Sequence, residues 1–172
     1  MTINPKKSHV STSVKFILAQ LFMGFLIFID QYTKACIEGS FYYNEDYPII
    51  PHFFSLTFTK NSGVAFGMGQ NAPDLFRQVF FIGVPVLVCL WLLYSIFKEI
   101  KQLWPVGFSY MLILSGAIGN LYDRIAQGKV VDFLLFYYKD WQFPAFNVAD
   151  SLITIGAGII LIDLLINKRE SK

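Results

Sequence analysis

The chain has 172 residues, of which 55% are hydrophobic and only 15% are charged, and its formal net charge is +2. Soluble domains usually carry about 25% charged residues, so a compact body of this composition would expose large apolar patches to water. These values exclude a disordered chain, a nucleic-acid-binding protein that works through bulk positive charge, and an ordinary cytosolic enzyme. They leave an integral membrane protein.

Four apolar segments predict four transmembrane helices, at approximately residues 14–34, 76–98, 103–123 and 146–167. The two middle segments have uncharged stretches of about the 20 residues that a helix needs to span a bilayer. The first and last reach this length only with their flanks. A cleaved signal peptide is the alternative for the first segment, but no small-residue cleavage site follows its apolar stretch, so we interpret it as a retained helix. The chain is then a single integral-membrane domain, 1–172.

The distribution of basic residues predicts the orientation. Four helices put both termini on one side of the membrane, and the short segments on that side hold most of the Lys and Arg residues: Lys6, Lys7, Lys15, Lys98, Lys101, Lys168, Arg169 and Lys172. By the positive-inside rule this side is cytoplasmic. The longer connecting segments, 35–75 and 124–145, are therefore expected at the outer face.

The first outer segment predicts a small β structure. Residues 53–59 alternate between apolar and polar side chains and are typical of a strand. Asn61-Ser62-Gly63 then indicates a turn, and Pro73 with Asp74 predicts the start of the next helix, since proline and an acidic residue are both favoured in a first turn. We expect a small, aromatic-rich β platform on the outer membrane surface.

Ionisable residues at membrane depth are expensive unless they are paired, so each is a functional candidate. Asp30 and Lys34 stand four residues apart in the order that favours a helical ion pair, and we interpret them as an anchor for the outer end of the first helix. Asp163 lies far along the last helix, near the cytoplasmic headgroups, where we expect it to be solvated.

The third apolar segment ends in small residues at positions 115, 116, 117 and 119, and Gly156-Ala157-Gly158 offers a matching surface on the last helix. This pattern predicts close packing of the two helices. Asn120 and Arg124 are one turn apart, so an amide and a guanidinium point into the same space, and the guanidinium suits a carboxylate or a peptide carbonyl. Structural anchoring at the membrane interface is the alternative for Arg124.

Asp132 and Asp150 are the strongest candidates for chemistry. Asp132 is a lone carboxylate in an apolar stretch, and Asp150 lies in the opening turns of the last helix. Burial raises the pKa of a carboxyl group, and two such groups in one site can share a proton, one acting as base and the other as acid. Such a pair can activate water against a peptide bond. The alternative for Asp150 is a helix-dipole contact; Asp132 has no cation within two residues.

The sequence lacks the residue patterns that other types of catalytic or cofactor site require. It has no H-E-x-x-H motif and no Cys/His ligand set, its two histidines are His9 and His52, and no base is placed to activate a membrane-depth serine. It contains no phosphate-binding or dinucleotide fingerprint. We therefore expect no metal and no cofactor. Cys36 and Cys89 are interpreted as small apolar residues without a disulfide.

Five motifs, in this order along the chain, resemble those of the lipoprotein signal peptidases (signal peptidase II), which are bacterial aspartic intramembrane proteases. One small departure is Ser115, where the family often has glycine. The matching motifs are Asp30-Gln31-Tyr32-Thr33-Lys34, Asn61-Ser62-Gly63-Val64-Ala65-Phe66, Gly116-Ala117-Ile118-Gly119-Asn120-Leu121-Tyr122-Asp123-Arg124, Val130-Val131-Asp132-Phe133 and Phe146-Asn147-Val148-Ala149-Asp150.

The resemblance implies a catalytic dyad of Asp132 and Asp150. It also implies residues that bind substrate or support the site, namely Asn61, Gly63, Asn120, Arg124, Asn147, Asp30 and Lys34. The implied fold is a mainly α membrane protein of four transmembrane helices, with a small β-cradle and an amphipathic helix on the outer, periplasmic face of the bacterial inner membrane.

The implied activity is removal of the signal peptide from a diacylglyceryl-modified prolipoprotein, by a cut on the amino side of the lipidated cysteine. The expected partners are this substrate and membrane lipids, with no nucleic acid, and the expected state is a monomer. Two alternatives stay open. A small transporter or proton-relay protein would use intramembrane carboxylates to carry ions, and a non-catalytic assembly subunit would need only the packing motifs.

Overall fold

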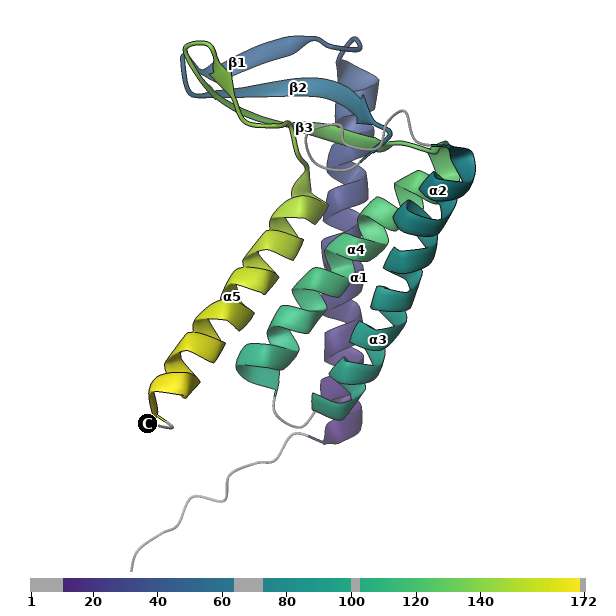
Figure 1. The fold of residues 1–172 in the computed structure, drawn as a ribbon, viewed down its shortest axis with the longest axis vertical. Coiled ribbons are helices and arrows are strands. Elements are labelled where there is room, and N and C mark those ends of the chain that lie inside the picture. The colour runs from purple at the N-terminus through teal and green to yellow at the C-terminus, as the bar shows by residue number, and fades with distance from the viewer. Residues whose placement is uncertain (1–10, 64–72, 100–102, 171–172) are drawn as a thin grey trace, which may run out of the picture.

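The computed structural model describes residues 11–63, 73–99 and 103–170, which form a helical bundle with a small antiparallel sheet at one end (Figure 1). The helices run side by side below the sheet, and the start of α1 and the end of α5 lie at the end of the bundle away from it. The elements in chain order are α1 (Thr12–Ser40), β1 (Asp46–Ile50), β2 (Phe54–Asn61), α2 (Asp74–Gln78), η2 (Val79–Gly83), α3 (Val84–Glu99), η3 (Leu103–Gly107), α4 (Phe108–Gln127), β3 (Val130–Tyr138), β4 (Trp141–Gln142) and α5 (Val148–Glu170).

Three helical segments of the described chain are long and apolar enough to cross a membrane: Thr12–Ser40, Leu75–Lys98 and Val148–Asn167. The second is continuous from α2 through the π-helical η2 into α3. The predicted fourth span corresponds to α4, which is not among these three. Its last turns carry Asn120, Asp123 and Arg124, and these residues lower its average hydropathy.

The two helices that carry the predicted support residues extend further toward the sheet than expected. α1 continues past residue 34 to Ser40, because Ile37 is buried against the sheet in a cluster with Phe58, Val131 and Phe133. α4 continues past residue 123 to Gln127, where Gly128 adopts φ 71° and donates its N–H to the Arg124 carbonyl at 3.1 Å. This left-handed glycine ends the helix in the usual way.

The strands form one antiparallel sheet in the order β1-β2-β3-β4. The predicted strand at 53–59 is confirmed as β2, and the predicted helix start after Pro73 is confirmed as α2. β2 pairs with β3 although the two are far apart in sequence, and this pairing sets Thr59 opposite Asp132. The pairing with β2 thus holds the Asp132 backbone in the sheet, while β4 pairs only with the far end of β3, at Tyr137 and Tyr138.

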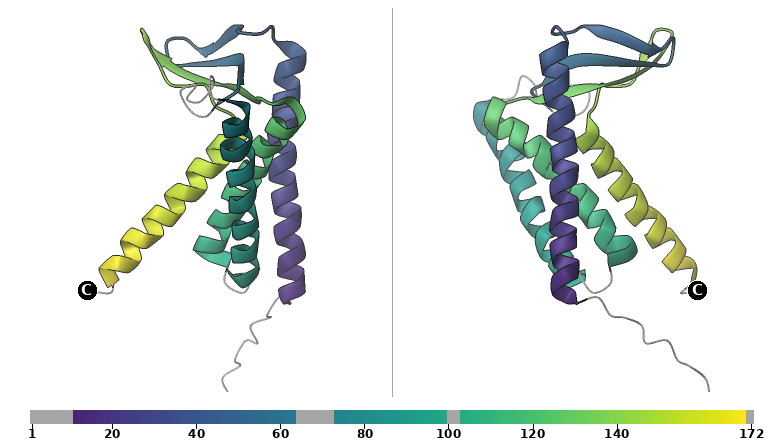
Figure 2. Two further views of the ribbon diagram at one scale, coloured as in Figure 1. Left: turned by 45° about the vertical axis from the view of Figure 1, so that its right-hand side comes forward. Right: turned by 180° about the vertical axis from the view of Figure 1, so that it is seen from behind.

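Small residues bring α4 close to its neighbours, as the sequence predicts. A side-chain carbon on Gly116 would collide with the Ala149 carbonyl of α5, and one on Gly156 would lie 2.8 Å from the Ser109 carbonyl of α4. Gly158 does not take part in this seam, because nothing lies within 4 Å of its Cβ position. Beyond the seam α5 leans away from the other helices toward its C-terminal end (Figure 2).

The predicted amphipathic helix of the outer face has no separate counterpart among the helices of the described residues. Residues 64–72, which include Val64-Ala65-Phe66 of the second motif, lie outside the described residues. The described helices expose large apolar side chains around the bundle, among them Leu21, Leu87 and Leu161 at 66%, 66% and 59%. This pattern fits a lipid environment rather than water.

Candidate active site

Asp132 and Asp150 reach one cavity from different elements. Asp132 projects from β3 and is 3% exposed, and Asp150 lies in the first turn of α5 and is partly buried. Both line a cavity of about 760 Å³ between the sheet and helices α3, α4 and α5. Most of the other lining residues are apolar, so this cavity offers two carboxyl groups in otherwise apolar surroundings.

Asn147 links the two aspartates. It is the residue before α5, and its side-chain carbonyl accepts the backbone N–H of Asp150 at 2.9 Å, while Asp150 Oδ2 accepts the backbone N–H of Asn147 at 3.3 Å. This reciprocal arrangement is a capping box. Because the Asn147 oxygen faces the helix, its amide nitrogen faces the strand and donates to Asp132 Oδ1 at 2.7 Å. Asn147 therefore caps the helix that carries Asp150 and also fixes Asp132.

Asn120 orients the second carboxylate in the same way. Its Nδ2 donates to Asp150 Oδ1 at 2.7 Å, while its Oδ1 accepts from Lys34 Nζ at 3.0 Å and from Asn147 Nδ2 at 3.2 Å. An ammonium group can only donate, so Lys34 determines which end of the Asn120 amide points to Asp150.

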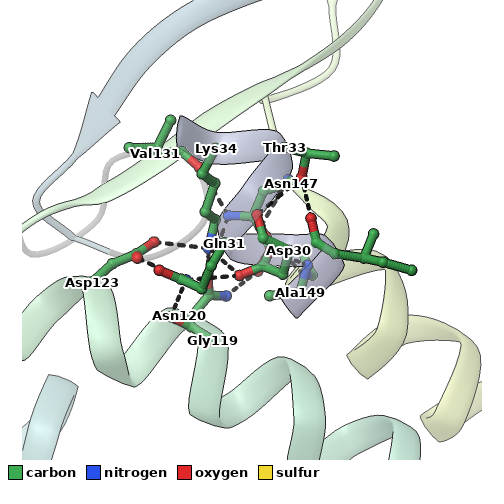
Figure 3. Close-up of polar contacts among 12 residues, drawn as sticks. Asp30, Gln31, Thr33, Lys34, Gly119, Asn120, Asp123, Val131, Asn147 and Ala149 are labelled. Carbon is green, nitrogen blue, oxygen red and sulfur yellow. Dashed lines mark hydrogen bonds and ion pairs between the residues drawn. The ribbon is translucent and has the colours of Figure 1, made fainter. Parts of the chain in front are cut away.

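Lys34 is the centre of a buried ionic cluster between α1 and α4 (Figure 3). Its Nζ lies 2.8 Å from Asp30 Oδ2 and 2.7 Å from Asp123 Oδ2, and all three residues are at most 3% exposed. Asp30 Oδ1 also accepts the backbone N–H of Ala149 at 2.8 Å, which ties α1 to the start of α5. The predicted Asp30–Lys34 pair is thus present, and it joins three helices instead of anchoring one.

A further part of the site, next to Asp132, consists of Asn61, Gly63 and Arg124. Asn61 Nδ2 donates to Asp132 Oδ2 at 3.2 Å, and Asn61 Oδ1 accepts the backbone N–H of Gly63 at 2.9 Å. Arg124 donates to the Gly63 carbonyl at 3.3 Å and lines the cavity that contains both aspartates. The guanidinium holds a peptide carbonyl, as its chemistry predicts, and that carbonyl belongs to the chain itself.

The surroundings of Asp132 raise the pKa of its carboxyl group to about 7. Burial is the largest cause, because an apolar environment disfavours the charged form, and the negative charge of Asp150 adds to it. The hydrogen bonds from Asn61 and Asn147 and the charge of Lys34 act in the opposite direction. Near neutral pH this carboxyl group can therefore either donate or accept a proton.

The structure brings together all nine residues that the sequence singled out for the site. Two further members, Gln31 and Asp123, are not among these nine, although Asp123 belongs with the ionisable residues that the sequence marks as functional candidates. Gln31 Nε2 lies 3.0 Å from Asp123 Oδ1 and 3.1 Å from Asp30 Oδ2, so it joins the two acids that flank Lys34. Both stand inside matching motifs, and Asp123 precedes Arg124, but nothing in the sequence indicates which face of its helix each occupies. Among the described residues, no group of three or more His, Cys, Asp or Glu side chains is arranged to hold a metal ion.

The model of one protein family, described as signal peptidase (SPase) II, matches residues 22–166 of the chain. Proteins called lipoprotein signal peptidase are similar over most of their length. The one from Syntrophus aciditrophicus is 39% identical over 90% of this chain and 96% of its own. The one from Shewanella loihica is 40% identical over 84% and 85%, respectively.

Solved structures agree with this similarity. A bacterial membrane enzyme determined by the in meso method at 2.3 Å resolution superimposes with a TM-score of 0.79 and 31% sequence identity, over 90% of this chain and 92% of the other. A second, at 1.9 Å, has a TM-score of 0.75 at the same identity. The helical bundle with a sheet at one end is therefore shared with a bacterial membrane enzyme.

Proposed function

The chain belongs to the signal peptidase II family, and from this premise we propose that it is an aspartic endopeptidase that removes the signal peptide from diacylglyceryl-modified prolipoproteins. Asp132 and Asp150 are the proposed catalytic residues, and the bond cut is on the amino side of the lipidated cysteine. The observation that carries the proposal is that both carboxyl groups line one apolar cavity while asparagine amides orient each of them.

The proposed reaction is attack by water. Asp150 accepts a proton from a water molecule, whose oxygen bonds to the carbonyl carbon of the scissile peptide. Asp132 gives its proton to the carbonyl oxygen, which produces a tetrahedral diol. Collapse of this intermediate breaks the C–N bond as Asp150 returns its proton to the leaving nitrogen and Asp132 takes one back from the diol. The products are a carboxyl group on the signal peptide and a free α-amine on the lipidated cysteine.

The supporting residues have defined tasks in this scheme. Asn147 and Asn120 keep the two carboxyl groups in place through the reaction, and Lys34 keeps Asn120 in the required orientation. The raised pKa of the Asp132 carboxyl group makes it suitable to carry the proton of the resting dyad. Since two coupled acids titrate as a unit, pH-dependent activity would report on the pair.

The apolar cavity supports a lipid-modified substrate. Val84 and Val88 of α3 and Ile153 of α5 line it together with the aspartates. These helices belong to two of the candidate membrane spans. A diacylglyceryl group attached to cysteine could therefore stay in apolar surroundings while its peptide bond lies at the dyad.

We also propose the orientation in the bacterial inner membrane. α4 crosses the membrane as a fourth helix, both termini are cytoplasmic, and the sheet and dyad lie at the outer face. The monomer is the proposed working unit, with membrane lipids and the precursor as its partners. The alternative of a transporter or proton relay fits less well, because Asp132 lies on a strand and Asp150 in the first turn of a helix, whereas ion carriage calls for carboxylates along the helix middles.

Orientation can be tested in intact cells with a membrane-impermeant maleimide. In a background with Cys36→Ala and Cys89→Ala, a cysteine at Asp140, in the turn between β3 and β4, should be labelled from outside. A cysteine at Lys98, at the other end of α3, should be labelled only after the membrane is opened. The reverse pattern would refute the orientation.

The activity is tested with purified protein in detergent and two synthetic peptides that differ only in the diacylglyceryl group on their cysteine. Mass spectrometry should find a single cut, on the amino side of the cysteine, in the lipidated peptide, and far slower cleavage of the unmodified one. Equal cleavage of both peptides, or a cut elsewhere, would contradict the proposed substrate.

A further inference from the structure

Asp132 also lines a second cavity, which is more polar than the first. This cavity, of about 590 Å³, lies against the sheet and is bordered on its other side by the segment from Gln142 to Ala145. The two cavities meet at Asp132, because both are lined by Asn61, Asp132, Phe143, Pro144 and Ala145, whereas Asp150 lines only the first. Where the first cavity is mainly apolar, about half of the second is lined by hydroxyl, amide and charged side chains, and the rest by apolar ones such as Leu135 and Phe143.

The polar side chains of the second cavity form a row across three strands. Asp132 of β3 pairs with Thr59 of β2, and Thr57, two residues along the same strand, pairs with Asp46 of β1. All four line the cavity. With about 4.8 Å between strands and 3.3 Å per residue along a strand, the row spans about 12 Å, the length of three to four residues of extended peptide.

We infer that this polar cavity binds the residues that follow the lipidated cysteine in the precursor, in extended form, as a hydrophilic peptide subsite. The inference rests on the proposed function. An apolar signal peptide and its lipid match the first cavity, whereas the segment after the cysteine belongs to the mature protein and leaves the membrane. The junction of the two cavities at Asp132 is where the bond between these parts has to lie.

The charges of the cavity indicate what sort of peptide fits. Lys60 is neutralised by Glu38 of α1, at 2.7 Å from its Nζ, and it does not present a free cation to the ligand. Asp46 is exposed at the far end of the row. The nearest positions are Thr59 and Thr57. The Thr59 hydroxyl donates to the Asp132 carbonyl at 3.3 Å and can still accept, and the Thr57 hydroxyl can donate and accept. The subsite therefore suits small polar residues directly after the cysteine.

The test is a length series of lipidated peptides with one signal sequence and from zero to six residues after the cysteine. For the wild-type protein kcat/KM should rise as residues are added, by about tenfold in total if one or two net hydrogen bonds form, and should level off at the third or fourth. A value that does not depend on length would overturn the inference, while cleavage of the shortest peptide would still support the proposed function. If no peptide is cleaved, both fail.

Three variants sharpen the series. Gln142→Trp fills the polar cavity and should make all lengths react alike, and the isosteric Thr57→Val should reduce the gain from added residues. Val88→Phe obstructs the apolar cavity and should lower cleavage of every peptide by the same factor. Full length dependence in folded Gln142→Trp and Thr57→Val proteins would count against the subsite.

Discussion

The Asn147 amide donates to Asp132 Oδ1 at 2.7 Å while its carbonyl oxygen caps the helix that carries Asp150. One side chain therefore fixes both members of the dyad relative to each other, one on a strand and one on a helix. The amide cannot turn over without losing both contacts, because its nitrogen would then face the Asp150 N–H and its oxygen the Asp132 carboxyl group.

This relationship predicts that Asn147→Ser separates stability from activity. Serine caps a helix about as well as asparagine, so the thermal midpoint in detergent should fall less than in Asn147→Ala. It lacks the amide donor to Asp132, and loss of one such donor in an active site typically costs about 10²-fold in kcat. Asn147→Ala loses both functions and should additionally lose about 1 kcal/mol of stability. Wild-type turnover by a folded Asn147→Ser protein would contradict the assigned role.

The alkaline limb of the pH profile should follow the dyad. The pKa of Asp132 is raised to about 7, so the shared proton is lost as the pH rises through 7, and activity should fall there. The hydrogen bond from Asn61 opposes this rise because it stabilises the charged form. Asn61→Leu should therefore move the limb to higher pH, as measured by kcat/KM from pH 5 to 9. A shift to lower pH would refute the assignment.

The raised pKa of Asp132 should also make the folded state less stable as the pH rises. A carboxyl group whose pKa is higher in the folded state than in the unfolded chain favours folding most at low pH, and this contribution is lost as the pH rises toward the folded-state pKa. Asp132→Asn removes this ionisation. The thermal midpoint of the variant minus that of the wild type should therefore increase as the pH rises from about 4 to 7. Parallel curves for the two proteins over this range would contradict the shift.

Much of the fold follows from the sequence because composition and periodicity are local properties. The apolar segments and the strand at 53–59 needed no tertiary information. The extension of α1 to Ser40 depends on Ile37 packing against a sheet whose other strand lies far along the chain, and no local pattern indicates that contact. For the same reason, the sequence did not place Asp132 on a strand.

The two proposed catalytic aspartates could be singled out because charges are few in this chain, and each carboxyl group in apolar sequence needs an explanation. The uncharged residues Asn61, Gly63 and Asn147 were indicated only by the resemblance of their motifs. The sequence did not indicate which faces of the helices α1 and α4 meet in the folded protein. Gln31 and Asp123 lie on the faces of α1 and α4 that meet at Lys34, and only the crossing of those helices brings them together. The second cavity likewise depends on the pairing of β1, β2 and β3.

Substitutions at Lys34 and Asp123 should have non-additive effects on the stability of the fold. Lys34→Met leaves Asp30 and Asp123 buried without their cation, and breaking a buried ion pair on one side costs about 3–5 kcal/mol. Asp123→Asn in the same chain removes one of the two uncompensated charges. The double variant should therefore unfold at a higher temperature in detergent than Lys34→Met alone. Simple additivity of the two single effects would show that the charges do not interact as the geometry requires.

Two helix glycines, one in close contact with a neighbouring helix and one without such a contact, allow a controlled comparison. Gly116→Ala would drive a methyl group into the Ala149 backbone and should destabilise the fold by about 1–3 kcal/mol, the usual cost of overpacking. Gly158→Ala has open space around the new methyl group and should be neutral or stabilising, since alanine favours a helix by up to about 1 kcal/mol over glycine. Thermal unfolding in the same detergent compares them, and equal effects would contradict the close approach of α4 and α5.

The central claim, that Asp132 and Asp150 together activate water, is tested most directly by the two isosteric variants Asp132→Asn and Asp150→Asn. Each would be purified in detergent, shown to be folded by its thermal transition, and assayed on a lipidated precursor peptide. Both should lose cleavage by several orders of magnitude, because an amide can neither take the proton from water nor give one to the carbonyl oxygen. Wild-type cleavage by either folded variant would contradict the account.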